Sequence, residues 1–115
     1  MIVGIGIDVC PVERFASAAA RPGMLERLFT AAEQHSSMTR MAGRFAAKEA
    51  FAKALGAPTG LVWTDVEVDK DDAGKPFFVC RGTVAARVQE LQISTIHLSI
   101  THDAGIAAAV VVCER

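Results

Sequence analysis

The first 23 residues predict a strand followed by a helix. Ile2 to Asp8 mixes small and β-branched residues, which is typical of a buried strand, and Gly4 and Gly6 allow another backbone or a ligand to come close. Pro11 suits the first position of a helix that runs to about Ala20, where its missing N–H costs nothing. The Arg21-Pro22-Gly23 sequence ends this helix.

The middle of the chain is predicted to be mainly helical. A short helix is expected from Met24 to Phe29, and the Thr30-Ala-Ala-Glu33 sequence matches a capping box, which predicts a further helical turn. Gln34 to Met41 is polar and is expected to be a loop or a frayed turn. The alanine-rich run from Arg44 to Gly56 predicts a longer helix.

The second half of the chain predicts two hairpins separated by a helix. Leu61 to Val68 and Phe77 to Cys80 are expected to pair through the turn residues between them. Thr83 is expected to cap a helix that runs to about Leu91. Thr95 to Thr101 and Ile106 to Cys113 then form the second hairpin. This order of elements predicts an α+β fold with a mostly antiparallel sheet, in a single domain that spans residues 1–115.

The composition excludes several classes of function. Hydrophobic residues make up 51% of the chain and the mean hydropathy is +0.31, which is high for a small monomer, so some apolar surface is expected between subunits. The net charge of −1 provides no basic field that would attract nucleic acid. No apolar run is long enough to cross a bilayer and no charged leader precedes one, so a cytoplasmic protein without membrane contact is expected.

The cysteines do not form a recognisable metal or redox motif. Cys10, Cys80 and Cys113 have no CxxC spacing, and each lies in or beside an apolar segment. Buried free thiols are therefore expected rather than disulfides or a zinc site.

The predicted helix from Arg44 to Gly56 carries four ionisable side chains among alanines. With 3.6 residues per turn, Arg44 and Lys48 share one flank of the helix, and Glu49 and Lys53 share another. One carboxylate among three cations can hold a metal ion beside a polyanion, because a hard divalent cation prefers carboxylate oxygens and phosphate prefers Lys and Arg. Taken alone, the pattern is more typical of a solvated helix face, on which an i,i+4 pair adds only about 0.3–0.5 kcal/mol.

Two further residues are candidates for chemistry because of their positions. Asp8 ends an apolar strand, and if Pro11 is the first helical residue the capping position falls on Cys10, which leaves the carboxylate free to bind a metal ion. His102 ends another strand just before a turn, where a solvated histidine would explain it as well as a functional one.

Three motifs in this order resemble the holo-acyl-carrier-protein synthases, the compact type of 4'-phosphopantetheinyl transferase. They are the opening Gly4-Ile-Gly-Ile-Asp8, the helix Arg44-Phe-Ala-Ala-Lys-Glu-Ala-Phe-Ala-Lys-Ala-Leu-Gly56, and the strand His97-Leu-Ser-Ile-Thr-His102. The helix is the most specific, and the resemblance extends from Ile2 to about Val112. It implies the 4'-phosphopantetheinyl transferase fold and transfer of the 4'-phosphopantetheine arm of coenzyme A to a serine of an apo acyl carrier protein, with release of adenosine 3',5'-bisphosphate.

The resemblance also implies roles for individual residues. Asp8 and Glu49 would hold Mg²⁺, and Lys53 would act at the diphosphate and the reacting centre. Four other positions would contact coenzyme A: Arg44 and Lys48 at the nucleotide phosphates, and Thr101 and His102 near the 3'-phosphate.

The first helix would dock the acidic carrier protein through Arg14 and Arg21, although Glu13 adds an unfavourable charge there. Family members are usually homotrimers with sites between subunits, which the apolar composition fits. The general base, and whether the carrier serves fatty-acid, polyketide or peptide synthesis, stay open.

Two other functions remain alternatives. A Mg²⁺-dependent nucleotide phosphohydrolase could use the same two carboxylates, and it would have no need of the helix that carries Arg14. A non-catalytic oligomeric binding module could carry the same helix as a merely packed, charged element. The joint presence of Asp8, Glu49, Lys53 and His102 favours the transferase over this module.

Overall fold

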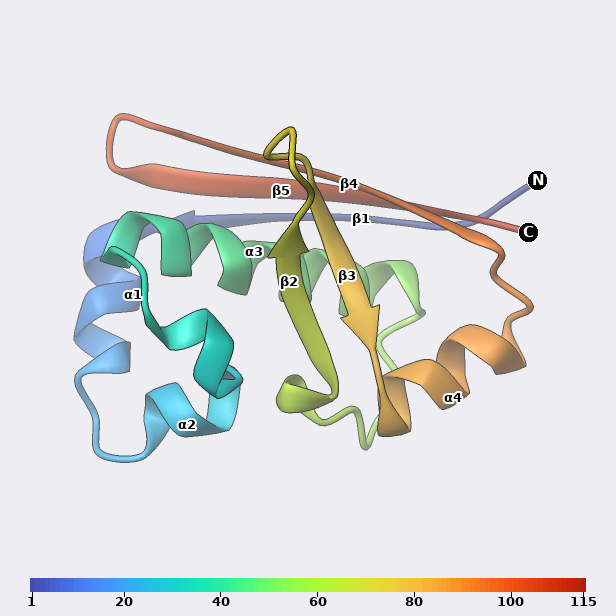
Figure 1. Cartoon of the computed structure of the whole chain (residues 1–115), viewed down its shortest axis with the longest axis horizontal. Helices are drawn as coiled ribbons and strands as arrows, with labels where there is room; N and C mark the ends of the chain where they lie inside the picture. Colours follow the sequence, from blue (N-terminus) through green and yellow to red (C-terminus); the bar gives the residue numbers. More distant parts are fainter.

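A three-stranded antiparallel sheet forms one layer of the computed structural model, which covers residues 1–115 (Figure 1). Its strands are β1 (Ile2–Pro11), β5 (Ile106–Glu114) and β4 (Thr95–Asp103), in the spatial order β1-β5-β4. Ala104 and Gly105 both have positive φ and make the two-residue turn between β4 and β5, which matches the right-handed twist of the strands. Both chain termini lie at the same end of this sheet.

Helices and a second, smaller sheet cover one face of the three strands. The helices are α1 (Val12–Ala19), α2 (Met24–Leu28), α3 (Met38–Ala54) and α4 (Gly82–Glu90), with short 3₁₀ turns η1 (Ala31–Gln34) and η2 (Trp63–Asp65). The hairpin of β2 (Val66–Lys70) and β3 (Pro76–Cys80) crosses α3, and its turn reaches the large sheet beside β4 (Figure 1). The expected α+β class with antiparallel sheets is thus confirmed.

Helix α3 lies directly on strand β1 because two glycines remove the side chains that would separate them. A Cβ atom on Gly6 would lie 1.7 Å from the carbonyl oxygen of Ala50, and one on Gly4 would lie 1.9 Å from that of Ala54. Five of the six alanines of α3 are correspondingly buried. The glycines of the opening motif thus allow two backbones, and not a ligand, to come close. This contact fixes which side chains of α3 lie beside the end of β1.

The opposite face of β1 is not covered within this chain. Ile5, Ile7 and Val9 are 65%, 64% and 58% exposed, whereas Gly6 and Cys10 on the other face are buried. In the strand register Ile7 lies beside Val110 of β5, which extends the apolar surface across two strands. The expectation that this segment is a buried strand is therefore correct for only one of its faces.

Several element boundaries differ from those predicted. Pro11 is the N-cap residue of α1 and ends β1 rather than beginning the helix. Helix α3 begins at Met38, capped by Ser37, whose hydroxyl accepts the N–H of Arg40, so residues 38–41 of the polar 34–41 segment are helical. Helix α4 begins at Gly82, so Thr83 is not its cap.

The expectations for the capping box and for the cysteines are confirmed. Thr30 and Glu33 form the capping box of η1. All three cysteines are free thiols, with Cys10 and Cys113 buried and Cys80 half-buried. Burial raises the pKa of Cys113 to about 11, with a smaller contribution from nearby Cys80. No helix has the length and apolar character needed to cross a membrane.

Candidate functional site

The carboxylate of Asp8 and the C-terminal half of α3 meet at one edge of the sheet. Asp8 belongs to the same face of β1 as Gly6, so it points toward α3. The ammonium group of Lys53 donates hydrogen bonds to Oδ1 of Asp8 at 3.2 Å and to the carbonyl oxygen of Ile7 at 3.0 Å. Because the Lys53 side chain is 51% exposed, it remains accessible from solvent at this edge.

Glu49 completes a pair of carboxylates with Asp8. Burial raises the pKa of Glu49, and the nearby charge of Asp8 raises it further, while Lys53 acts in the opposite direction. A carboxylate whose ionisation is disfavoured by a neighbouring anion is stabilised by a cation placed between the two groups. No cluster of three or more Asp, Glu, His or Cys side chains suited to a metal ion occurs in the chain. This donor set suits Mg²⁺, which keeps several water or phosphate ligands and needs only one or two carboxylates.

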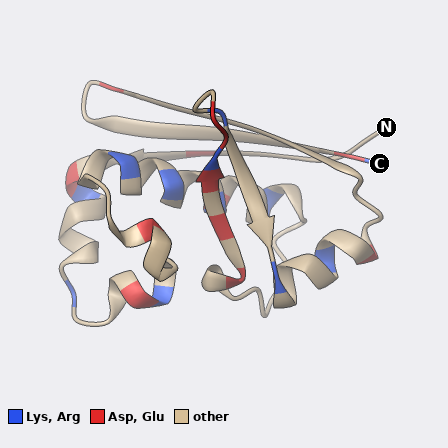
Figure 2. Ribbon diagram, in the orientation of Figure 1, with Lys and Arg blue, Asp and Glu red and all other residues tan.

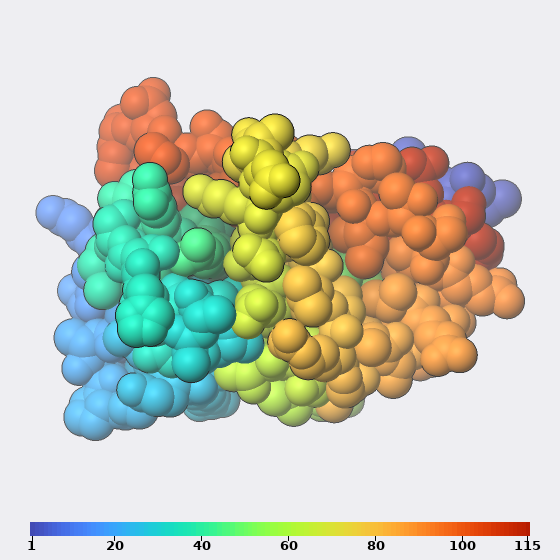
Figure 3. Space-filling view, in the orientation of Figure 1, coloured from blue at the N-terminus to red at the C-terminus, as the bar shows by residue number.

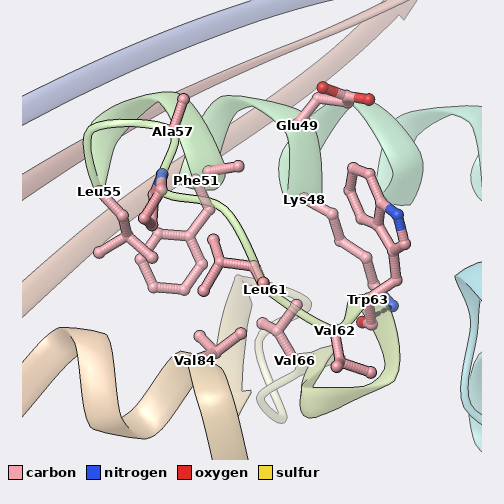
Figure 4. A pocket seen from close by; sticks show the side chains of 13 residues that line it. Lys48, Glu49, Phe51, Leu55, Ala57, Leu61, Val62, Trp63, Val66 and Val84 are labelled. Atoms are coloured by element: carbon pink, nitrogen blue, oxygen red, sulfur yellow. Dashed lines mark hydrogen bonds between the residues drawn. The ribbon is translucent and has the colours of Figure 1, made fainter.

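An apolar pocket of about 210 Å³ opens next to Glu49 (Figure 4). Its walls come from α3, from the segment between α3 and β2, and from α4, and they include Phe51, Leu61, Trp63 and Val84. The indole ring of Trp63 packs against Phe45, with ring centroids 5.7 Å apart. Glu49 therefore lies at the edge of a mainly hydrophobic hollow, and its carboxylate points away from the apolar side chains (Figure 4).

A second pocket, of about 250 Å³, has four basic side chains in its lining and is named the cationic pocket. Arg40 and Arg44 from α3, Lys70 from the β2–β3 hairpin and His102 from β4 all contribute to it. The contributing segments lie next to one another on the face shown in Figure 3, where the hairpin is yellow, and Figure 2 marks the basic positions of α3 in blue. Arg44 is held in place by hydrogen bonds from its guanidinium group to the carbonyl oxygen of Glu33 and to Oγ of Ser36. Such a set of donors is suited to phosphate groups.

The two parts of the candidate site lie on different flanks of α3. This helix crosses the sheet, with Gly43 over Ile100 of β4 and Ala50 over β1. Arg44 and Glu49 are five positions apart, which corresponds to about 140° around the helix axis. Arg44 lines the second pocket and Glu49 the apolar one, so the two flanks face different surroundings.

The prediction that Lys48 contacts coenzyme A is wrong in this structure. Its side chain is 0% exposed, and its ammonium group donates to Oε1 of Glu33 at 2.7 Å, to Leu28 O at 2.8 Å and to Trp63 O at 3.1 Å. All three N–H groups are thus used within the chain. Burial lowers the pKa of Lys48, and the contacts with Glu33 only partly oppose this effect.

Thr101 is not brought together with His102. Successive residues of a strand point to opposite faces, and Thr101 lies with Ile7 and Ser99 in a shallow groove on the outer face of the sheet. His102 faces the cationic pocket on the other side. Within one chain, the two residues therefore cannot bind the same phosphate.

The two arginines expected at a docking surface are both exposed. Arg14 lies on α1, whereas Arg21 follows the end of that helix at Ala19 and belongs to the turn before α2. The structure thus places Arg14 alone on the helix that was expected to carry both.

A comparison with known protein families identifies the chain. The model of the 4'-phosphopantetheinyl transferase superfamily matches residues 4–111. The chain belongs to this superfamily. A holo-[acyl-carrier-protein] synthase of Frankia alni is 54% identical over 115 residues, with 98% of each chain covered. The resemblance carried by the three motifs is therefore confirmed, and this member of the superfamily is an enzyme of the holo-[acyl-carrier-protein] synthase type.

Solved structures agree with this assignment. The holo-[acyl-carrier-protein] synthase of Neisseria meningitidis has a TM-score of 0.88 and 31% identity, with both chains fully covered. The enzyme of Helicobacter pylori, solved in complex with coenzyme A, has a TM-score of 0.84 and 32% identity, with 96% of this chain and 99% of that chain covered. The transferase fold expected from the sequence is thus confirmed.

Sequence reasoning missed several residues that shape the site of this transferase. Arg40 and Lys70 join the cationic pocket from segments that were expected to be a loop and a turn. Trp63 forms a wall of the apolar pocket, and the only sequence signal for it was that it is the single tryptophan. Glu33 was recognised as a capping residue, but its pairing with Lys48 joins positions 15 residues apart, which no local pattern reveals.

Proposed function

We propose that this transferase moves the 4'-phosphopantetheine arm of coenzyme A to a serine hydroxyl of an apo acyl carrier protein and releases adenosine 3',5'-bisphosphate. The observation that carries the proposal is the carboxylate pair of Asp8 and Glu49 with Lys53 beside it, next to an apolar pocket that Glu49 helps to line. The complex of coenzyme A with the Helicobacter pylori relative supports coenzyme A as the donor substrate.

In this proposal the two carboxylates and Lys53 act on the diphosphate. Asp8 and Glu49 would hold Mg²⁺, which would supply positive charge to the diphosphate oxygens. Lys53 is already oriented by Ile7 and Asp8, and its remaining N–H can donate to an oxygen on the β-phosphorus. The serine oxygen bonds to this phosphorus as the bond to the bridging oxygen breaks, and the bisphosphate leaves with the electron pair. The serine proton passes to water or to Asp8.

The two pockets suit different parts of coenzyme A. The cationic pocket, with Arg44 and His102 and the additional Arg40 and Lys70, would bind the nucleotide phosphates. The apolar pocket beside Glu49 would receive the pantetheine arm, which begins at the diphosphate. Thr101, on the outer face of the sheet, would contact coenzyme A only across a subunit boundary.

We further propose that the active form is a homotrimer with sites between neighbouring subunits. The support is the uncovered apolar surface of Ile5, Ile7, Val9 and Val110, because soluble monomers rarely expose a contiguous patch of this kind. The separation of the carboxylates and the cationic pocket on different flanks of α3 adds to this support, since a neighbouring copy can bring the two parts together. Sedimentation equilibrium at micromolar concentration would contradict the proposal if it gave an active monomer.

The carrier protein would dock on α1 and the following turn. Arg14 and Arg21 are exposed there and can pair with acidic residues of the carrier, while Glu13 limits the strength of the contact. These charges act mainly on the rate of encounter, so the docking should depend on ionic strength.

Intact-mass spectrometry of an apo carrier incubated with the enzyme, coenzyme A and Mg²⁺ tests the proposed function. We expect a carrier that gains the mass of one phosphopantetheine, and no gain with a carrier whose acceptor serine is replaced by alanine or with the Glu49→Gln enzyme. Cleavage of coenzyme A without any carrier would instead identify the phosphohydrolase alternative. Binding of coenzyme A with neither product would identify the binding module.

A further inference from the structure

A buried ion pair joins α3 to the segments that precede it and follow it. The ammonium group of Lys48 and Oε1 of Glu33 are 2.7 Å apart, and the side chains are 0% and 1% exposed. The carboxylate of Glu33 also accepts the N–H of Thr30 at 2.9 Å and the N–H of Val68 at 2.8 Å. Every buried polar side-chain atom of the chain has a hydrogen-bond partner, so this network is complete.

Stability alone is a weak reason for such a pair. Removing two charges from water costs several kcal/mol, and replacing a buried pair with apolar residues is often neutral or stabilising. What the pair provides is geometry, because its hydrogen bonds fix the end of α2, the capping box of η1, the first strand of the hairpin and η2 relative to a single lysine of α3.

One of these bonds reaches a wall of the apolar pocket. Lys48 donates to the carbonyl oxygen of Trp63, which lines the pocket and whose ring packs against Phe45. Lys48 is also the residue immediately before Glu49, so the same turn of α3 carries the carboxylate and holds the wall (Figure 4). The position of Trp63 relative to Glu49 is therefore set through Lys48.

We propose that Lys48, held by Glu33, is a positioning residue that fixes Trp63 beside Glu49 and so keeps the apolar pocket in the shape that its substrate requires. The kinetic part of this inference rests on the proposed function, in which this pocket receives the pantetheine arm. Lys53 on the neighbouring flank faces the substrate, whereas Lys48 acts only through the wall that it holds.

Trp63 is the single tryptophan of the chain, so its fluorescence reports the position of this wall directly. The test uses the double variant Lys48→Met with Glu33→Gln, which removes both buried charges together. We expect it to fold, with a shifted emission maximum and stronger quenching by acrylamide. The KM for coenzyme A should rise on the order of tenfold, with a smaller fall in kcat, because the wall is displaced while Glu49 stays on its helix. Lys75→Met, at an exposed turn lysine whose side chain makes no hydrogen bond or ion pair, is the matched control and should change neither readout.

The outcomes separate positioning from stabilisation. A folded double variant with unchanged emission and quenching, and a KM for coenzyme A within about twofold of the original, would overturn the proposal and leave the pair a purely stabilising role. If the double variant does not fold, Glu33→Asp keeps both charges but withdraws the carboxylate by one methylene, and the same two readouts decide. If the unaltered protein transfers no phosphopantetheine, the proposed function fails, while the fluorescence of Trp63 still tests the positioning.

Discussion

The contact between β1 and α3 makes a quantitative prediction for Gly6→Ala. The added Cβ atom would lie 1.7 Å from the carbonyl oxygen of Ala50 and 2.9 Å from the backbone nitrogen of Ala54. Ordinary contact begins at 3.4 Å, so the helix would have to withdraw by about 1.7 Å, the difference between the two distances. The neighbour is helix backbone rather than a flexible side chain, and it cannot move aside alone.

The expected cost follows from this displacement. Adding a methyl group to a packed core typically costs ~1–3 kcal/mol, and a clash between two backbones belongs at the upper end. A loss of ~3 kcal/mol corresponds to a fall in Tm of roughly 12 °C for a chain of this size. Because Glu49 and Lys53 would move with α3, away from Asp8 on β1, we also expect kcat to fall by about 100-fold.

Thermal unfolding and transfer assays at equal protein concentration test this prediction. Activity is measured at a temperature at which circular dichroism shows the variant to be folded, so that lost geometry is separated from lost protein. Gly43→Ala is the matched control for stability, because its Cβ would meet only the Cγ2 atom of Ile100 at 3.0 Å and alanine favours the helix by up to about 1 kcal/mol. A Gly6→Ala enzyme with an unchanged Tm and full kcat would refute the idea that this contact sets the site.

Other predictions concern charge. Glu49→Gln should abolish transfer yet raise the Tm at neutral pH, because burial and Asp8 both disfavour the ionised form; a lowered Tm would contradict this. The pKa of Glu49 is raised on folding, so the protonated carboxyl contributes to the free energy of unfolding at acid pH. This contribution is lost as the pH rises through the pKa of Glu49 in the folded protein. The Tm of Glu49→Gln should therefore exceed that of the unaltered protein by more at neutral pH than at acid pH. The affinity of the enzyme for Mg²⁺ should fall on acidification already above the ordinary glutamate pKa, because protons compete with the ion for Glu49, and an affinity that falls only below it would oppose the assignment. Arg14→Glu should raise the apparent KM for the carrier several-fold and weaken its salt dependence, with the constant for coenzyme A unchanged; the reverse pattern would refute the docking surface.

Much of the fold follows from local patterns in the sequence. The two hairpins and the alanine-rich helix were predicted because strand alternation and turn residues are local signals. The start of α3 at Met38 was missed because its polar first turn has no apolar periodicity, and its stability comes from the Ser37 cap and from tertiary contacts. The exposure of Ile5 and Ile7 was missed because an apolar strand face has the same sequence pattern whether it is buried within the chain or against another subunit.

The sequence predicted only those parts of the site that follow from the spacing of residues along a helix or strand. The opening glycines and the spacing of Glu49 and Lys53 identified one flank of the helix and the strand that it meets. Lys48, the residue before Glu49, was misassigned because a helical pattern shows which residues share a flank and not which flank becomes buried. Its partner Glu33 had a satisfactory local role as a capping residue, so nothing in the sequence required a second one.

The placement of the two pockets makes one further prediction about assembly. If each site takes its carboxylates from one subunit and its cationic pocket from the next, Glu49→Gln and Arg44→Ala disable different halves of the same site. In a mixed trimer purified through both tags, a site is complete when its carboxylates come from the Arg44→Ala chain and its cationic pocket from the Glu49→Gln chain, which occurs in roughly a third of the interfaces. Two differently tagged variants, co-expressed and purified through both tags, should therefore recover activity that neither variant has alone. If the mixed assembly shows no more activity than the separate variants, each chain builds its site alone, and the proposed sharing between subunits is wrong.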